Sequence, residues 1–309
     1  MSRRLAYLYI ATAAFCWGII GIFISYLYEL GFNPTQVVAI RLITAAVVLF
    51  LYVYFTTRHL LKIKLSDSKY FIGTGIVSLV FFNWCLFNAL QETTIAIAAI
   101  LLYTAPAFVT ILSRLFFKEP LTARKLSALF VTFIGCAFVI SVFPSTSDSI
   151  STYGLILGIG AGLFYALYSI FGKFALMKYD SITVTIFTFI FGAVAITPFS
   201  GLSSVIPLIL NIKAVLCIIG LGIVSTVFAF TLYTKGLSAV ESSRASIIAT
   251  IEPVIAALSG FLVFNERLGG WQYIGILMVI AAVIIVQERN EKEIPSDLEL
   301  NHSSSSGEF

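Results

Sequence analysis

Glu252 and Pro253 interrupt an otherwise apolar run of helical length, residues 247–258. A carboxylate in such surroundings either forms hydrogen bonds between packed helices, or lines a cavity where it binds a cationic group or exchanges a proton. Ala249 and Ala256 share its helical face and are small enough to border a cavity. Pro253 cannot donate to the carbonyl of Ala249, so it should distort the helix. We expect Glu252 to face a cavity.

Arg41 is the second ion in an apolar run, and its neighbours there are Val, Ile, Ala and Leu. Two interpretations are open. Its long stem reaches the nearer membrane interface, or its guanidinium meets the carboxylate of a substrate or pairs with another cavity residue.

A binding cavity also needs apolar walls with a few oriented polar groups, which aromatic side chains with polar tips and amides supply. Because 15% of the residues are aromatic, any one of these could instead be packing. Pro106 is expected to distort a second helix near the site. The remaining candidates for the walls are Trp17, Asn83, Trp84, Tyr103, Tyr165, Tyr168 and Tyr233.

The sequence offers little for catalysis. The two histidines, His59 and His302, lie in a basic loop and in the C-terminal tail, and the four cysteines form no C-x-x-C pair. No P-loop and no paired carboxylates are evident. We therefore expect no enzyme, no metal site and no cofactor, although proton coupling through Glu252 is a candidate.

The elements that position these residues are membrane-spanning helices. Hydrophobic residues make up 59% of the chain, charged residues only 11%, and the mean hydropathy is +1.01, which is typical of an integral membrane protein. Apolar segments of about 20 residues, each long enough to cross the bilayer, predict ten spans. Their limits are 5–28, 34–55, 70–90, 94–116, 122–143, 153–175, 181–200, 212–235, 243–264 and 271–288.

Basic residues predict the orientation, because Lys and Arg are retained on the cytoplasmic side. With both termini in the cytoplasm, Lys213 and Arg267 lie outside, Arg41 lies within a span, and the other sixteen of the 19 basic residues lie inside. These sixteen are Arg3, Arg4, Arg58, Lys62, Lys64, Lys69, Arg114, Lys118, Arg124, Lys125, Lys173, Lys178, Lys235, Arg244, Arg289 and Lys292. The net charge of +4 thus reflects membrane topology and gives no reason to expect nucleic acid as a partner.

The chain repeats itself at an offset of 147 residues, as the stretches IVSLVF (76–81) and IVSTVF (223–228) show. At this offset Pro106 meets Pro253 and Glu119 meets Glu266, whereas Glu252 meets Ala105. Five spans are an odd number, so the second copy must enter the membrane from the opposite side. The pattern predicts an all-α fold of two inverted five-helix repeats (5+5), residues 1–147 and 148–290, with a site between them.

The sequence resembles the EamA-type family of the drug/metabolite transporter superfamily. The resemblance rests on the element FCWG (15–18), on EPV (252–254) with Glu266 thirteen residues after the proline, and on the weaker first-half version from Pro106 to EPL (119–121). It covers residues 5–288 and implies two four-helix arrangements with one peripheral helix each, a central substrate cavity and alternating access. It also implies transport of amino acids, other metabolites or drugs, most often outward.

We therefore expect a secondary transporter of amino acids or related compounds in a bacterial or archaeal cytoplasmic membrane, with export favoured. Uptake of a cationic amine or another nutrient, or a membrane channel, is the alternative. The partners expected are a small-molecule substrate and the lipid bilayer, and the protein is expected to be a monomer or a homodimer. Residues 291–309 are expected to form a disordered tail that ends in a cloning remnant. Glu119 and Glu266 are expected to have structural roles at helix ends.

Overall fold

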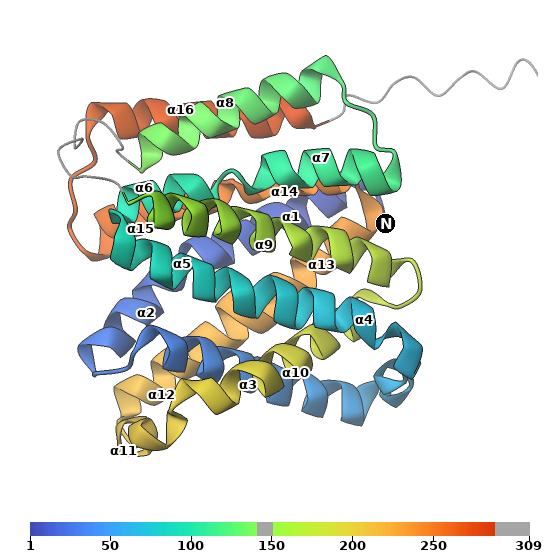
Figure 1. Cartoon of the computed structure of the whole chain (residues 1–309), viewed down its shortest axis with the longest axis vertical. Helices are drawn as coiled ribbons and strands as arrows, with labels where there is room; N and C mark the ends of the chain where they lie inside the picture. The colour runs from blue at the N-terminus through green and yellow to red at the C-terminus, as the bar shows by residue number, and fades with distance from the viewer. Residues whose placement is uncertain (141–150, 288–309) are drawn as a thin grey trace, which may run out of the picture.

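The computed structural model describes residues 1–140 and 151–287, and within these ranges the chain is helical without a strand (Figure 1). The predicted tail, 291–309, lies outside the described residues. Eight of the ten predicted spans coincide with helical stretches that are long and apolar enough to cross a membrane. These are Arg3–Glu29, Pro34–Thr56, Leu65–Glu92, Ile95–Phe117, Thr152–Leu176, Ser181–Ser200, Ile212–Ala239 and Ser242–Val263.

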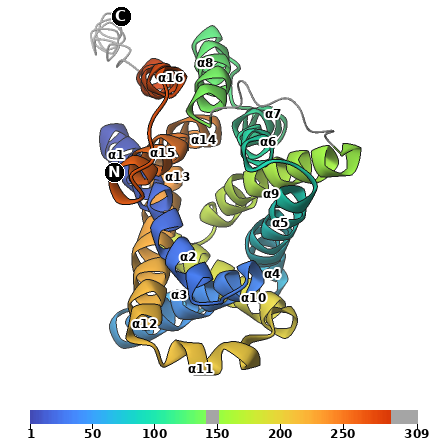
Figure 2. The same ribbon diagram turned by 90° about the vertical axis from the view of Figure 1, so that its left-hand side faces the viewer.

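The other two predicted spans, 122–143 and 271–288, coincide with shorter helices. They are α8 (Ala123–Val139) and α16 (Gly270–Val286), each of 17 residues. At about 1.5 Å per residue such a helix is roughly 26 Å long, slightly less than the thickness of a hydrocarbon core. The two helices lie side by side as a layer of their own (Figures 1 and 2). Ten crossings in two inverted halves therefore remain a prediction.

Most of the eight stretches consist of more than one helix. In the first half the elements are α1 (Arg3–Gly18), α2 (Ile20–Glu29), α3 (Pro34–Thr56), η1 (Arg58–Leu61), η2 (Leu65–Asp67), α4 (Ser68–Phe71), the π-helical η3 (Ile72–Val80), α5 (Phe81–Glu92), α6 (Ile95–Leu102) and α7 (Ala105–Phe117). In the second half they are α9 (Thr152–Leu176), α10 (Ser181–Ser200), η4 (Leu202–Val205), α11 (Ile206–Ile209), α12 (Ile212–Ile219), the π-helical η5 (Gly220–Phe228), α13 (Ala229–Ala239), α14 (Ser242–Ala249) and α15 (Ile251–Val263).

Helix breaks occur just before the two prolines that the sequence singled out. The first break separates α6 from α7 before Pro106, and the second separates α14 from α15 before Pro253. In both cases the proline falls in the first turn of the new helix, where an N–H would have no partner within the helix. Pro253 therefore helps to begin α15, and the expected distortion takes the form of a complete break.

The helices of the two halves correspond at the offset of 147 residues. The bounds of α6 become those of α14, and the bounds of α8 become those of α16. Even the turns match, because Lys118 (φ 55°) and Asn265 (φ 53°) are the two residues other than glycine with a left-handed backbone in the described chain. The sequence repeat is thus accompanied by a repeat of local structure.

The helices form a bundle whose two ends differ. One end, the N-terminal face, holds the N-terminus and the turn between α7 and α8; the other, the distal face, holds the α2–α3 connection and the turn between α15 and α16 (Figure 1). Small residues such as Ala13, Ala45 and Ala245 are fully buried, which brings helices close together. Large apolar side chains such as Phe55 and Leu262 are exposed, as expected of a surface that meets acyl chains.

Candidate functional site

A cavity of about 180 Å³ lies between the halves and contains Glu252. Its walls come from α1, α2, α3, η3, α5, α6, α9, α13 and α15, and Tyr28 and Pro34 mark its distal end. The cavity brings together seven of the candidate residues from the sequence: Trp17, Arg41, Asn83, Tyr165, Tyr168, Tyr233 and Glu252.

Glu252 lies in the first turn of α15, directly after the helix break. The first turn of a helix has N–H groups without partners, and its partial positive charge stabilises a carboxylate. The hydroxyl of Tyr165, on α9, donates a hydrogen bond to Oε2 of Glu252 at 3.2 Å. The break therefore positions a carboxylate at the cavity wall. The first helix of the second half, α9, supplies one hydrogen-bond donor to it.

Arg41 enters the same cavity from α3 in the first half. Its Nε is buried and makes no hydrogen bond with the described residues, and the same is true of Nε1 of Trp17. Buried donors normally have partners, so unpartnered donors beside a cavity indicate positions where a ligand can accept hydrogen bonds. The structure thus places Arg41 in the cavity wall, and its role in binding a substrate stays a prediction.

Aromatic rings form one side of the cavity. Trp17 lies against Phe230 and Tyr233, with ring centroids 5.0 and 5.1 Å apart. The hydroxyl of Tyr233 shares a 2.7 Å hydrogen bond with Ser169, and that of Tyr168 lies 2.8 Å from Oγ1 of Thr234. Because these hydroxyls are occupied, the two tyrosines present mainly their ring bodies to the cavity.

A second, much smaller cavity of about 20 Å³ lies on the other side of Glu252, toward the N-terminal face. Tyr103 and Pro106 line it, and Tyr165, Tyr233 and Glu252 line both cavities. The carboxylate therefore lies at the boundary between an open space on the distal side and a nearly closed space on the N-terminal side.

Gly18 brings α1 against the first turn of α15. A Cβ at this position would lie 2.8 Å from the carbonyl oxygen of Glu252 and would also collide with the side chain of Ile255. Gly21 differs, because a Cβ there would meet nothing within 4 Å. Of the two glycines in this part of the chain, only Gly18 permits a close approach at the site.

Two candidates lie apart from the cavities. Trp84 is 53% exposed on α5 and lines neither cavity, so its inclusion in the site was wrong. Its neighbour Asn83 faces the larger cavity, and the next residue along a helix points about 100° away. Pro253 is buried and lines neither cavity, although it adjoins Glu252.

Sequence reasoning missed Phe230 and Ser169. Phe230 packs edge-on against Trp17, and Ser169 bonds Tyr233. The repeat offered a signal for the first of these, because Phe230 is the equivalent of Asn83 at the offset of 147. Ser169 has no comparable signal in the sequence.

Comparisons with known proteins agree with this architecture. A family model described as the EamA-like transporter family matches residues 4–141 and 152–287. An uncharacterized transporter of Archaeoglobus fulgidus is 34% identical over 197 residues, which cover 64% of this chain and 68% of that one. The uncharacterized transporter YwfM of Bacillus subtilis is 24% identical over 294 residues, 95% of this chain and 97% of that one.

One solved crystal structure superimposes with a TM-score of 0.78 at 17% sequence identity and covers 93% of this chain and 97% of that chain. A likeness at this level of identity concerns the fold alone.

Proposed function

This chain belongs to the EamA-like transporter family and is a transporter rather than an enzyme, and from this premise we propose that it carries amino acids or closely related metabolites across the cytoplasmic membrane by alternating access. The observation that carries the proposal is the presence of Arg41 and Glu252 in the walls of one cavity. A cation and an anion that face the same space match a substrate with both a carboxylate and an ammonium group.

The carboxylate of such a substrate meets the guanidinium of Arg41, whose unpartnered Nε supplies a charge-assisted hydrogen bond. Its ammonium group meets Glu252 and the neighbouring ring of Tyr165. Apolar side chains such as Leu79 and Phe82 complete the walls and suit an apolar substrate side chain. The volume of about 180 Å³ is below the roughly 300–1,000 Å³ of pockets for drug-sized ligands, which favours a small metabolite.

The proposed orientation rests on the basic residues, and the proposed direction rests on the resemblance to the family. Arg3, Lys118, Lys173 and Arg244 surround one hollow at the N-terminal face, which supports a cytoplasmic location for that face. The larger cavity extends toward the distal face, and we take the described state as the outward-facing one under this assignment. Export is the favoured direction, and protonation of Glu252 is the proposed means of coupling.

Uptake of a cationic amine is the second candidate function. Glu252 together with the rings of Trp17, Tyr165 and Tyr233 provides a setting for an ammonium group without any need for Arg41. The two candidate functions predict different effects of the positive charge of Arg41. An amino acid needs its positive charge, whereas an amine is repelled by it.

Counterflow in proteoliposomes tests the proposal. Vesicles preloaded with an unlabelled amino acid should accumulate the labelled amino acid, and should not accumulate the amine made by its decarboxylation. Glu252→Gln should reduce this counterflow and remove its dependence on pH. Glu29→Gln changes an exposed carboxylate at the end of α2 and is the matched control.

Uptake of the amine alone would select the second candidate. Unchanged transport and unchanged pH dependence in Glu252→Gln would overturn the role of Glu252. Counterflow of none of these compounds would contradict both candidate functions.

A further inference from the structure

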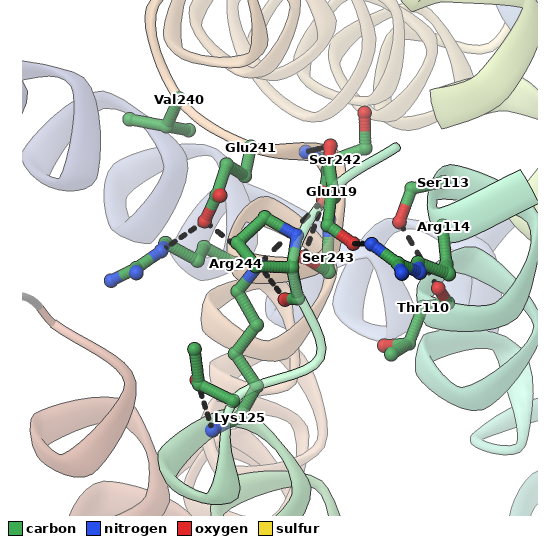
Figure 3. A network of polar contacts seen from close by, with 12 residues as sticks. Thr110, Ser113, Arg114, Glu119, Lys125, Val240, Glu241, Ser242, Ser243 and Arg244 are labelled. Atoms are coloured by element: carbon green, nitrogen blue, oxygen red, sulfur yellow. Dashed lines mark hydrogen bonds and ion pairs between the residues drawn. The ribbon is translucent and has the colours of Figure 1, made fainter. Parts of the chain in front are cut away.

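Glu119 joins the two halves at the N-terminal face. It follows α7 of the first half, and its carboxylate is buried against the start of α14 in the second half. Oε1 accepts a hydrogen bond from the backbone N–H of Ser242 at 2.7 Å, and Oε2 accepts from the N–H and the hydroxyl of Ser243 at 3.2 and 2.5 Å (Figure 3). Glu119 is thus an N-terminal cap for α14 supplied by a residue 123 positions away.

Charged side chains reinforce this contact. Nζ of Lys125 lies 2.9 Å from Oε2 of Glu241 and 4.0 Å from Oε2 of Glu119, and it donates to the carbonyl of Pro120 at 3.0 Å. Arg244 pairs with Glu241 (Figure 3). It also donates to the carbonyl of Val286 at 2.9 Å. Lys125 is 1% exposed and Glu119 7%, so the contact between the halves is buried, while Glu241 borders the hollow at this face.

The second half contains the same turn. Lys118 and Asn265 both have a left-handed backbone. Each is followed by a glutamate whose backbone N–H donates to a carbonyl of the preceding helix. Glu119 bonds the carbonyl of Ser113 at 3.3 Å, and Glu266 bonds that of Gly260 at 3.2 Å, which is the equivalent residue. The two carboxylates therefore begin from equivalent positions.

Their surroundings are opposite. Glu266 is exposed, and its carboxylate lies over Gly260 of its own half. The helix that it would cap by symmetry is α6, whose first residues, Ile95 and Ala96, correspond to Ser242 and Ser243. Ile95 is 78% exposed, whereas Ser242 is fully buried. Helix α14 packs extensively against α7, and no comparably extensive contact joins α6 to α15.

We infer that Glu119 and Glu266 are alternating caps that close opposite ends of the transport pathway. In the described state Glu119 caps α14 and joins the halves at the N-terminal face, while the larger cavity extends toward the distal face. In the opposite state Glu266 caps α6 through the N–H groups of Ile95 and Ala96, and the contact between Glu119 and α14 is broken. The inference rests on the proposed alternating access and adds a structural basis for each of its two closed ends.

The two caps differ in strength. At the offset of 147 residues, Lys125 corresponds to Gln272, Glu241 to Thr94 and Arg244 to Ile97. The distal cap therefore lacks the cations that reinforce Glu119. This difference favours the described state when no substrate is bound.

Thiol labelling in membranes tests the inference without any substrate. Ser246 lines the smaller cavity and Ile24 the larger one, so single cysteines at these positions report opening of the N-terminal face and of the distal face. The background replaces the four native cysteines, Cys16, Cys85, Cys136 and Cys217, by alanine. A membrane-impermeant maleimide is added to each side in turn.

Glu119→Gln should increase labelling at position 246 and decrease it at position 24, by about tenfold or more, because bonds to a charged acceptor are lost. Glu266→Gln should shift both sites in the opposite direction, and the double variant should lie between the two. Glu29→Gln is the control and should match the parent. The inference would be overturned if Glu119→Gln and Glu266→Gln shifted the labelling in the same direction, or if neither variant changed it.

Two proline variants each remove one backbone N–H donor and leave both carboxylates intact. Ser242 and Ile95 are the first residues of their helices, where proline is well tolerated. The preceding residues, Glu241 (ψ 140°) and Thr94 (ψ 156°), already have the extended backbone that proline requires. Ser242→Pro should act like Glu119→Gln, and Ile95→Pro like Glu266→Gln. Opposite shifts would contradict the inference.

The labelling outcome is separable from the proposed function. Reciprocal labelling without amino-acid counterflow would retain the caps and reject the substrate. Counterflow of amino acids without reciprocal labelling would retain the function and reject the caps.

Discussion

The hydroxyl of Tyr165 on α9 donates to Oε2 of Glu252 on α15 across the boundary between the larger and the smaller cavity. Under the proposed alternating access, a substrate that moves from one cavity to the other passes this hydrogen bond. The hydrogen bond also orients the carboxylate, because α15 alone leaves the side chain free to rotate. Both residues were candidates from the sequence, but their contact became evident only in the structure.

Tyr165→Phe should weaken substrate binding while leaving the fold intact. The variant removes a donor to a carboxylate, an interaction of about 1.5–3 kcal/mol, so we expect the KM of counterflow to rise roughly tenfold or more. Tyr153→Phe, which alters an exposed tyrosine near the start of α9, is the control. An unchanged KM in Tyr165→Phe would show that this hydrogen bond does not orient Glu252 for binding.

Arg41→Gln should distinguish the two candidate functions. If Arg41 binds the substrate carboxylate, the variant loses amino-acid counterflow by tenfold or more, because bidentate recognition of a carboxylate is lost. Arg41→Lys should recover only part of it, since an ammonium group is not bidentate. Arg267→Gln, in the exposed turn after α15, is the control. Faster transport of an amine by Arg41→Gln would favour the second candidate.

Gly18→Ala should destabilise the protein and Gly21→Ala should not. The new methyl group at position 18 would collide with the backbone of Glu252 and the side chain of Ile255, and overpacking of this kind costs about 1–3 kcal/mol. The methyl group at position 21 would meet nothing within 4 Å. Thermal unfolding in detergent, followed by intrinsic fluorescence, measures both variants. Equal melting temperatures would contradict the close packing of α1 on α15.

The lowered pKa of Glu241, at the N-terminal face, predicts that the stability of the folded protein depends on pH. Burial would raise the pKa of this carboxyl, but the hydrogen bonds and charges of Lys125 and Arg244 outweigh burial, so the pKa lies below its usual 4.5. A pKa that is lowered by folding stabilises the folded state above about pH 4.5, and this stabilisation is lost as the pH falls through the lowered value. The charged groups near Glu241 include Lys125, Arg244, Lys173 and Glu119.

The measurement compares Glu241→Gln with the parent between pH 7 and pH 3. At pH 7 the variant should melt at a lower temperature, and the difference should shrink as both proteins are acidified below pH 4.5. Glu92→Gln, at the exposed end of α5, is the control. A difference that is constant over this range would show that the charge of Glu241 does not stabilise the fold.

Much of the scaffold could be predicted from the sequence because hydrophobic length and repetition are strong signals. Eight predicted spans coincide with helices that can cross a membrane, and the offset that aligns Pro106 with Pro253 also aligns the helices around them. Glu252 could be singled out because an ion in an apolar run is costly. The family was confirmed by the match to its model over both halves.

Other features depend on contacts between distant segments, which hydropathy does not encode. Trp84 and Asn83 are neighbours of similar polarity, and only the packing of α5 decides which one faces the cavity. Glu119 could be recognised as a residue at a helix end, but its contact with Ser242 spans 123 residues and links the two halves. The break at Thr250 could be anticipated from Pro253, although its position upstream of Glu252 could not.

The third and the eighth predicted spans each contain a π-helical segment, η3 and η5, with extra residues in its turns. A wide turn holds more residues than an α-turn, so tightening it to α-geometry rotates everything that follows by about 100° per residue released. Asn83 lies three residues after η3 and Phe230 two residues after η5, and the two occupy equivalent positions in the larger cavity. One backbone rearrangement in each half would therefore rotate α5 and α13 about their own axes, and would turn an amide and a ring out of the cavity wall together.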